Sequence, residues 1–196
     1  MFTGIIQNKG VITEVTSSGK NISFWIESPI SDELYIDQSI AHNGVCLTVE
    51  ETRHGQHKVT AIQETLQKTN LNHWKINSVI NLERCLQMNG RLDGHLVQGH
   101  VDSVATCTEI IEKDGSWEYS FQFDTKFASL LIEKGSITIN GISLTLFDVS
   151  ANSFRVAIIP YTFEHTNMQN LSLSDEVNIE FDMIGKYINR LMELKK

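Results

Sequence analysis

The sequence has few of the residues that mark secreted, metal-binding or nucleic-acid-binding proteins. Its 196 residues include only three cysteines, Cys46, Cys85 and Cys107, which are widely spaced and form no CxxC pair. Neither a disulfide framework nor a structural zinc site is therefore expected. The net charge is −8 and no run of Lys or Arg occurs, which argues against nucleic acid and anionic membranes as partners.

Targeting and membrane-spanning signals are also missing. The first residues, MFTG, lack the basic and apolar regions of a signal peptide, and no apolar stretch is long enough to cross a bilayer. The hydrophobic fraction of 41% and the charged fraction of 20% are typical of globular proteins. We expect a reduced, cytoplasmic protein.

What the chain does contain is an internal repeat. The segment Ser39–Thr48, SIAHNGVCLT, returns as Ser136–Thr145, SITINGISLT, at an offset of 97 residues. The offset holds without a gap as far as Glu83 and Glu180, and 13 of these 45 aligned pairs are identical. A period of this length indicates a duplicated domain rather than a solenoid. Two copies of one pocket suggest two copies of one ligand.

Alternation of apolar and polar residues predicts six short strands in each half. In the first half these are Gly4–Val15, Asn21–Glu27, Gln38–His42, Cys46–Arg53, Lys58–Gln63 and Ser78–Leu86. Their counterparts are Gly99–Ile111, Glu118–Phe123, Gly135–Ile139, Ser143–Val149, Ser153–Ile159 and Glu176–Asp182. Closure removes the exposed edges of so small a sheet. We expect an all-β fold of two tandem six-stranded antiparallel Greek-key-like β-barrels.

The repeat also sets the expected domain boundaries. The first barrel should span residues 1–94, with a linker at about 87–94, and the second residues 95–182. Residues 183–196 show helical periodicity and have no counterpart in the repeat, which predicts a C-terminal α-helix that packs against another subunit. Short helical pieces are expected at Ser31–Leu34, Asp124–Glu133, Thr65–Leu71 and Thr162–Leu171.

Small polar residues follow the two Asn-Gly turns, which are type I′ hairpin signals. Cys46 and Ser143 occupy the same repeat position, followed by Thr48 and Thr145 on the same strand face. A hairpin alone would explain the turns. Small polar residues among apolar neighbours in both copies favour the lining of a pocket.

Two glycines align at an offset of 95 residues. Gly4 and Gly99 would let a ligand approach the backbone or would mark a bulge, and His100 takes the position that Ile5 has in the other half. At the end of each fifth strand, Thr65 and Thr162 could bind the amide edge of a heterocycle or cap the helix that follows.

A metal site is a weaker interpretation of the segment GHLVQGHVD. It offers His95, His100 and Asp102, but on a strand residues five apart point to opposite faces, so the two imidazoles would not converge. We expect no metal, and a structural role for a lone strand histidine.

On these residues the chain resembles the riboflavin synthases of the alpha-chain type, a lumazine-binding double-barrel family, over its whole length. The matching stretches are Met1–Ile5, His42–Val49, Glu64–Leu66, Gly94–Asp102, Lys134–Ser136, Asn140–Thr145 and Ile159-Pro160. Gln63, Tyr161 and Phe163 stand at positions regarded as variable in the family.

The resemblance implies a transferase that uses no metal or redox cofactor. Two molecules of 6,7-dimethyl-8-ribityllumazine would react, one giving four carbons to the other, to yield riboflavin and 5-amino-6-(D-ribitylamino)uracil. It also implies a homotrimer held by the C-terminal helices. Each active site would then bind two substrates between the first barrel of one subunit and the second barrel of its neighbour.

The resemblance also implies which residues bind the two substrates. It assigns to the first barrel Gly4, Ile5, Ile6, Cys46, Leu47, Thr48, Thr60, Ala61, Ile62, Gln63, Glu64 and Thr65. It assigns to the second barrel Gly99, His100, Val101, Lys134, Ser143, Leu144, Thr145, Ile159, Pro160, Tyr161, Thr162, Phe163, Glu164 and Asp182.

Three residues are candidates for the chemistry. His100 is the expected base, because an imidazole titrates near neutral pH. Cys46 or a hydroxyl such as that of Ser143 could add to the acceptor or assist proton transfer. The alternative is a non-catalytic lumazine- or flavin-binding protein of the same fold, like the fluorescent antenna proteins. Cys46 and His100, with pocket motifs in both halves, favour the enzyme.

Overall fold

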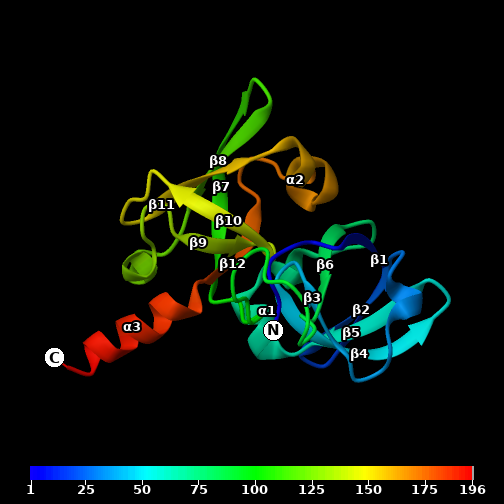
Figure 1. Ribbon diagram of the computed structural model, residues 1–196. Helices are drawn as coiled ribbons and strands as arrows, with labels where there is room; N and C mark the ends of the chain where they lie inside the picture. The colour runs from blue at the N-terminus through cyan, green and yellow to red at the C-terminus, as the bar shows by residue number, and fades with distance from the viewer. Residues whose placement is uncertain (196) are drawn as a thin grey trace.

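The computed structural model describes residues 1–195 and contains two closed, six-stranded antiparallel barrels (Figure 1). The first barrel has the strand order β1-β2-β5-β4-β3-β6, and its strands are β1 (Asn8–Ser18), β2 (Asn21–Glu27), β3 (Ser39–His42), β4 (Val45–Arg53), β5 (Gln56–Ala61) and β6 (Val79–Arg84). The second barrel repeats this ring with β7 (Ser103–Lys113), β8 (Ser116–Gln122), β9 (Ser136–Ile139), β10 (Ile142–Phe147), β11 (Ser153–Ile158) and β12 (Glu176–Phe181). The predicted double barrel is confirmed.

The duplication extends to local irregularities. Both hairpin tips have positive φ at Asn and Gly, with 46° and 78° at Asn43-Gly44 and 47° and 81° at Asn140-Gly141, as a type I′ turn requires. The β1–β2 register shifts between Ile12 and Glu14, and the β7–β8 register shifts at the corresponding Cys107 and Glu109. Equivalent strands are therefore equivalent in detail.

The first strand of each barrel begins later than the sequence predicts. β1 starts at Asn8 and β7 at Ser103, whereas alternation predicted starts at Gly4 and Gly99. The segments that precede these two starts run between the barrels. Phe2 pairs instead with Val97 through two backbone hydrogen bonds of 2.7 and 3.1 Å.

The helical pieces after the fifth strand of each barrel are shorter than predicted, because each is interrupted. α1 (Gln63–Lys68) and α2 (Pro160–His165) stop at extended threonines, Thr69 and Thr166. Each threonine then caps a 3₁₀ turn with its hydroxyl oxygen, at η2 (Asn70–His73) and η4 (Asn167–Asn170). The remaining short elements are η1 (Ser31–Glu33) and η3 (Thr125–Leu130).

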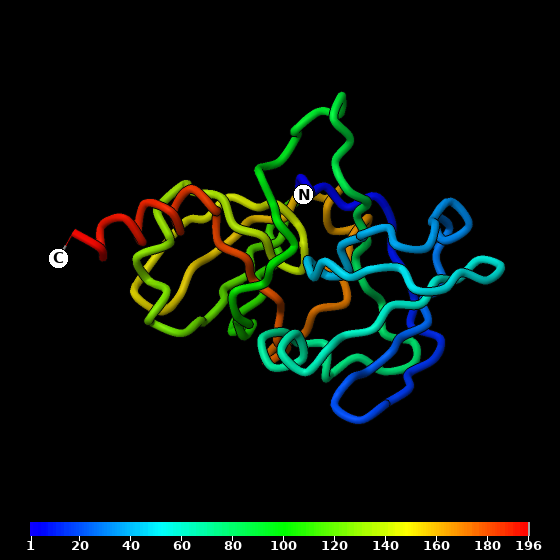
Figure 2. Tube along the Cα trace, turned by 90° about the horizontal axis from the view of Figure 1, so that it is seen from below, coloured from blue at the N-terminus to red at the C-terminus, as the bar shows by residue number. Residues whose placement is uncertain are grey.

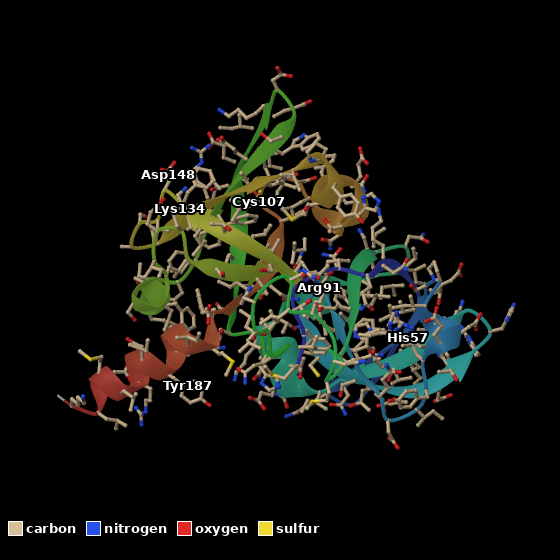
Figure 3. All side chains as sticks on the ribbon, viewed as in Figure 1. His57, Arg91, Cys107, Lys134, Asp148 and Tyr187 are labelled. Atoms are coloured by element: carbon tan, nitrogen blue, oxygen red, sulfur yellow. The ribbon has the colours of Figure 1, made fainter. Side chains whose placement is uncertain are left out.

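The C-terminal helix α3 (Met183–Glu193) extends away from both barrels (Figures 1 and 2). Its first residue follows Asp182, whose side chain accepts a hydrogen bond from the Ile184 amide and so caps the helix. Tyr187 points outward from it (Figure 3). Among residues 1–195, none of the helices combines the length and apolar character needed to span a bilayer.

Buried asparagines join the barrels around a local two-fold axis. The Asn81 side chain donates to the Asn140 carbonyl, and that of Asn178 donates to the Asn43 carbonyl, both at 3.0 Å. The same two side chains accept from the backbone amides of Asn167 and Asn70, both at 2.8 Å. Because these groups are buried and bonded across the interface, they fix how the barrels face each other.

Candidate functional site

The two glycine segments cross between the barrels. Gly4 precedes the first strand of the first barrel, but its carbonyl oxygen accepts a hydrogen bond of 2.8 Å from the Ser143 amide in the second barrel. Gly99 accepts one of 2.9 Å from the Cys46 amide in the first barrel. The sequence-based grouping was therefore wrong for these segments: Gly4 and Ile6 lie with Ser143 and the second barrel, whereas Gly99, His100 and Val101 lie with Cys46 and the first.

Glycine is required at both crossings. Gly4 and Gly99 each have φ of +78°, and an added Cβ would lie 2.6 Å from the Ser143 Cβ or 2.7 Å from the Cys46 Cβ. The alignment at an offset of 95 detected this pair. It could not show which barrel each glycine serves, because that depends on long-range hydrogen bonds.

The first site surrounds Cys46. A cleft of about 220 Å³ is lined by Cys46, the start of α1 and the crossing segment, with these residues: Val45, Cys46, Glu64, Thr65, Lys68, Thr69, Gly99, His100 and Val101. The His100 side chain is exposed here. Burial raises the pKa of the Cys46 thiol, and the charge of Glu180 from the other barrel acts in the same direction. At neutral pH the thiol is therefore protonated.

The second site surrounds Ser143. Its hydroxyl oxygen lies 2.7 Å from Nδ1 of His95, a half-buried side chain. Burial lowers the pKa of His95, and the nearby Asp182 carboxylate opposes that shift. With its proton on Nε2, the neutral imidazole accepts the hydrogen bond from the Ser143 hydroxyl.

His95 is the residue that sequence reasoning missed. It was interpreted as structural or as a failed metal ligand, because the segment was expected to be a strand. In the structure the segment crosses the domain interface, so His95 reaches the second site and His100 the first. Within residues 1–195, no group of three or more His, Cys, Asp or Glu side chains is arranged to hold a metal.

The other residues predicted for the first barrel lie on β4, on β5 and at the start of α1. Cys46 and Thr48 share a face of β4 that is open to solvent, whereas Leu47 is buried. Of the strand-end residues, Thr60 and Ala61 are on β5 and Ile62 precedes α1, whose first turn contains Gln63, Glu64 and Thr65.

The second barrel has a matching arrangement with different packing. Ser143, Leu144 and Thr145 lie on β10, and Ile159 precedes α2, which contains Pro160, Tyr161, Thr162, Phe163 and Glu164. The Phe163 ring stacks on Trp117, with ring centres 3.7 Å apart, and so packs against the core. Lys134, labelled in Figure 3, precedes β9, and its ammonium lies 5.4 Å from the centre of the Phe147 ring.

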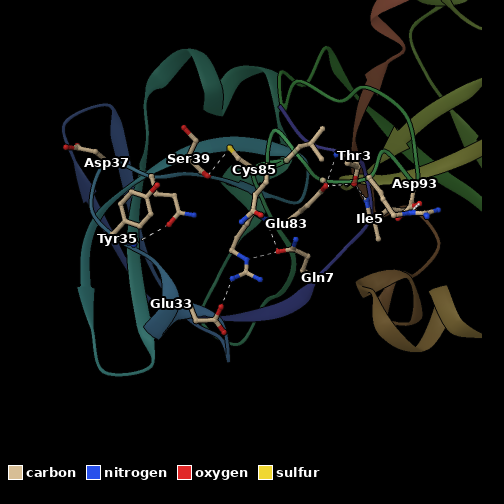
Figure 4. Close-up of a pocket in the computed structure, with 16 residues that line it drawn as sticks. Thr3, Ile5, Gln7, Glu33, Tyr35, Asp37, Ser39, Glu83, Cys85 and Asp93 are labelled. Carbon is tan, nitrogen blue, oxygen red and sulfur yellow. Dashed lines mark hydrogen bonds and ion pairs between the residues drawn. The ribbon is translucent and has the colours of Figure 1, made fainter.

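A larger cavity of about 730 Å³ lies beside the N-terminal segment (Figure 4). Thr3, Ile5, Glu83 and Cys85 line it, together with acidic and basic residues of the linker. Of the residues predicted to bind substrate, only Ile5 faces this cavity.

Comparisons with known proteins agree with the duplicated architecture. A family model described as "Lumazine binding domain" matches residues 3–85 and again residues 98–182. The chain is 41% identical to "Riboflavin synthase" from Actinobacillus pleuropneumoniae, covering 100% of this chain and 91% of that protein. It is 39% identical to "Riboflavin synthase" from Bacillus subtilis (strain 168), covering 98% and 90%.

Among solved structures, LumP complexed with riboflavin superposes with a TM-score of 0.87 at 21% identity, covering 92% of this chain and 99% of LumP. LumP has also been solved with 6,7-dimethyl-8-(1′-D-ribityl)lumazine, with a TM-score of 0.85 to this chain. At this identity the likeness concerns the fold.

Proposed function

Since the chain belongs to the riboflavin synthase family of lumazine-binding proteins, we propose that it catalyses the dismutation of two 6,7-dimethyl-8-ribityllumazine molecules. One molecule transfers four carbons to the other, which gives riboflavin and 5-amino-6-(D-ribitylamino)uracil. The observation that carries this function is a pair of equivalent sites with unequal chemistry. A thiol and an exposed imidazole occupy one site, and a hydroxyl bonded to an imidazole occupies the other.

In the second site, His95 makes the Ser143 hydroxyl a proton acceptor. The reaction needs a proton removed from the C7 methyl of one lumazine. When the Ser143 oxygen takes a proton from the substrate, its own proton passes to His95 over the 2.7 Å contact. The Asp182 carboxylate then favours the protonated imidazole.

In the first site, Cys46 and His100 face the acceptor molecule. The thiol is protonated at neutral pH, so its role is to add transiently to C7 of the acceptor while a base takes its proton. The S–C7 bond forms as the electron pair of the double bond at C7 shifts into the pyrimidinedione ring, and it breaks again, returning the thiol, when the product forms. His100 lines that cleft, and we assign it the role of this base. Thr48 and Thr145 supply hydroxyl groups to the first and second substrate, respectively.

We propose that the active site is completed between subunits of a homotrimer. A single chain encloses only about 220 Å³ around Cys46, less than the roughly 300 Å³ at which ligand pockets begin. One face of α3 leaves its apolar residues between 57% and 66% exposed, which suits helix contacts between subunits: Ile184, Tyr187, Ile188, Leu191 and Met192. Two stacked substrates would then react as in one molecule, with effective molarity of roughly 10⁵ M or more.

Two further parts of the proposal concern setting and partners. The three free thiols support a reducing, cytoplasmic location. The partners are the small-molecule substrates and further copies of the chain.

The second candidate is a lumazine- or flavin-binding protein without turnover, which the fold likeness to LumP favours. Incubation of the purified chain with 6,7-dimethyl-8-ribityllumazine separates the two functions. We expect the absorbance and green fluorescence of riboflavin to appear in step with loss of the lumazine. Stable lumazine fluorescence without conversion would instead establish the binding protein.

The trimer has its own test by sedimentation. Leu191→Glu places a charge on the exposed face of α3 and should convert trimers to monomers with loss of turnover. Asn189→Glu, at a half-buried polar position of the same helix, is the matched control. A wild-type chain that sediments as a monomer at assay concentration and still turns over would contradict an intersubunit site.

A further inference from the structure

Two buried glutamates hold the crossing segments. Glu83 on β6 and Glu180 on β12 occupy equivalent repeat positions and are 3% and 2% exposed. Carboxylates are seldom buried this deeply without partners, so their hydrogen bonds show what they do.

Glu83 binds the N-terminal segment. Its carboxylate accepts hydrogen bonds from the Thr3 amide at 2.7 Å, the Thr3 hydroxyl at 2.7 Å and the Gly4 amide at 3.0 Å. Figure 4 shows Glu83 directed at Thr3. The carbonyl of the same Gly4 accepts from Ser143. Glu83 is on β6 of the first barrel, and the segment that it holds therefore borders the site in the second barrel.

Glu180 does the reverse. Its carboxylate accepts hydrogen bonds from the Gln98 amide at 2.7 Å and the His100 amide at 2.8 Å. Between these residues lies Gly99, whose carbonyl accepts from Cys46. Glu180 therefore belongs to the second barrel and holds the backbone that carries His100 into the first site.

We propose that Glu83 and Glu180 are positioning residues that act crosswise, each fixing the backbone of the site in the opposite barrel. Neither touches the reacting atoms. Each sets where the glycine carbonyl and the residues after it lie relative to Cys46 or Ser143. Their importance for turnover rests on the proposed function, but the crosswise placement does not.

Their protonation behaviour agrees with this arrangement. Burial raises the pKa of both carboxyls, and the hydrogen bonds from the crossing segments oppose that shift at each. At Glu180 the nearby Lys186 ammonium also lowers the pKa, while Asp102 raises it. The backbone amides of the crossing segments therefore favour the ionised carboxylates of Glu83 and Glu180, which is the form that accepts their hydrogen bonds.

Site-resolved thiol alkylation tests the crosswise rule in the full-length protein. Cys46 reports on the first site, and Ser143→Cys in a Cys46→Ser background reports on the second. Iodoacetamide is the probe, and peptide mass spectrometry gives the rate for each thiol. Cys107 is 1% exposed in the second barrel's core, so its rate reports any opening of that barrel.

We expect Glu180→Gln to speed alkylation of Cys46 by at least about tenfold, since an amide replaces one acceptor oxygen with a donor. The thiol introduced by Ser143→Cys should change less than about twofold. Glu83→Gln should give the opposite pattern. Three results would overturn the proposal. A glutamate variant could speed alkylation only of the thiol in its own barrel, or it could speed both thiols equally. It could also leave both rates unchanged while Cys107 stays protected.

Removing the charge of Glu180 also lowers the pKa of Cys46, so a second pair of variants acts without changing charge. Gly99→Ala should displace its segment from Cys46 and speed Cys46 alkylation, and Gly4→Ala should do so at the second site. The glycine variants show how far each segment shields its thiol. If the Gln variants expose Cys107, Glu180→Asp and Glu83→Asp take their place, because they keep the charge but shorten the side chain by one methylene group; each should give the same crosswise pattern, and unchanged alkylation in both would overturn the proposal. Alkylation needs no turnover, so a chain that fails the riboflavin assay can still pass or fail this test.

Discussion

The two barrels have the same strand order and the same turns but different interiors. In the first, His42 and His57 are fully buried, and their Nε2 atoms lie 2.9 Å apart. In the second, the equivalent positions hold Ile139 and Phe154, which are also fully buried. The same ring of strands therefore accommodates, at these two positions, either a hydrogen-bonded histidine pair or two apolar side chains.

The histidine pair of the first barrel is fully hydrogen-bonded, because its protons can be assigned in one consistent chain. The Ser31 hydroxyl donates to His57 Nδ1 at 2.8 Å, His57 Nε2 donates to His42 Nε2, and His42 Nδ1 donates to the Ile40 carbonyl at 3.1 Å. The second barrel has Ala128 where the first has Ser31. Exchanging a single one of these residues between the barrels should therefore destabilise the protein, because it leaves an imidazole or a hydroxyl without its partner.

The largest expected effect comes from placing half of the pair in the wrong barrel. Phe154→His should destabilise the protein by about 4 kcal/mol, because apolar packing is lost and an imidazole is buried without partners. Urea unfolding at pH 7 measures the cost. Ile139→His supplies a hydrogen-bond partner for the new imidazole. In a double-mutant cycle, the coupling free energy between the two substitutions should therefore be about 1 kcal/mol in favour of the pair. Additive costs would show that the pair does not form in the second barrel.

Acidification should weaken the first barrel more than the second. Burial lowers the pKa of His57 to about 4, and burial together with His57 lowers that of His42 well below its usual range. The unfolded chain therefore binds protons first, so stability falls as pH drops from about 6.5 towards 4. For His57 alone the loss reaches about 3 kcal/mol.

The matched variant is His42→Ile with His57→Phe, which copies the second barrel. Carboxylates titrate in both proteins, so the difference between the two stability profiles isolates the histidines. We expect the profile of this variant to be flatter between pH 6.5 and 4, measured by urea unfolding at several pH values. Parallel profiles would contradict the assignment.

The catalytic comparison concerns one imidazole in each site. His95→Gln should lower kcat by roughly 100-fold, because Ser143 loses its proton acceptor, and His100→Gln should do so by a similar factor. Steady-state turnover measures both effects, and lumazine fluorescence titration checks that binding persists. A near-wild-type kcat in either folded variant would remove that residue from the proposed mechanism.

The smallest effect concerns the asparagines at the interface. Asn81 makes an additional hydrogen bond of 2.9 Å to the Asn167 side chain, whereas the equivalent oxygen of Asn70 has no partner. Asn81→Ala should therefore cost about 1 kcal/mol more than Asn178→Ala. Equal losses of unfolding free energy in the two variants, measured by urea unfolding, would show that the additional hydrogen bond of Asn81 contributes nothing to stability.

Much of the fold could be predicted from the sequence, because it rests on local patterns. Alternation located the strands and Asn-Gly located the hairpins, as the positive φ angles at Asn43 and Asn140 confirm. The strand starts at Gly4 and Gly99 were wrong. Alternation cannot tell whether an extended segment joins its own barrel or crosses to another.

The candidate site was predicted less completely. Cys46 and Ser143 were found because the repeat places them after equivalent turns. His95 was missed, because its partner Ser143 lies 48 residues away and no spacing rule joins them. The identity of Glu83 and Glu180 in the repeat was visible, but their role was not, since their partners are backbone amides near residues 3 and 99.

The sequence by itself determined that the chain has two barrels and two chemically unequal candidate sites, because strand periodicity, turn type and residue identity are local properties. Only the tertiary structure decided which segment serves which site. That choice depends on hydrogen bonds between Glu83 or Glu180 and amides about 80 residues away, and between each glycine carbonyl and the opposite barrel. Backbone amides carry no sequence signal, so their partners are defined only when the barrels meet.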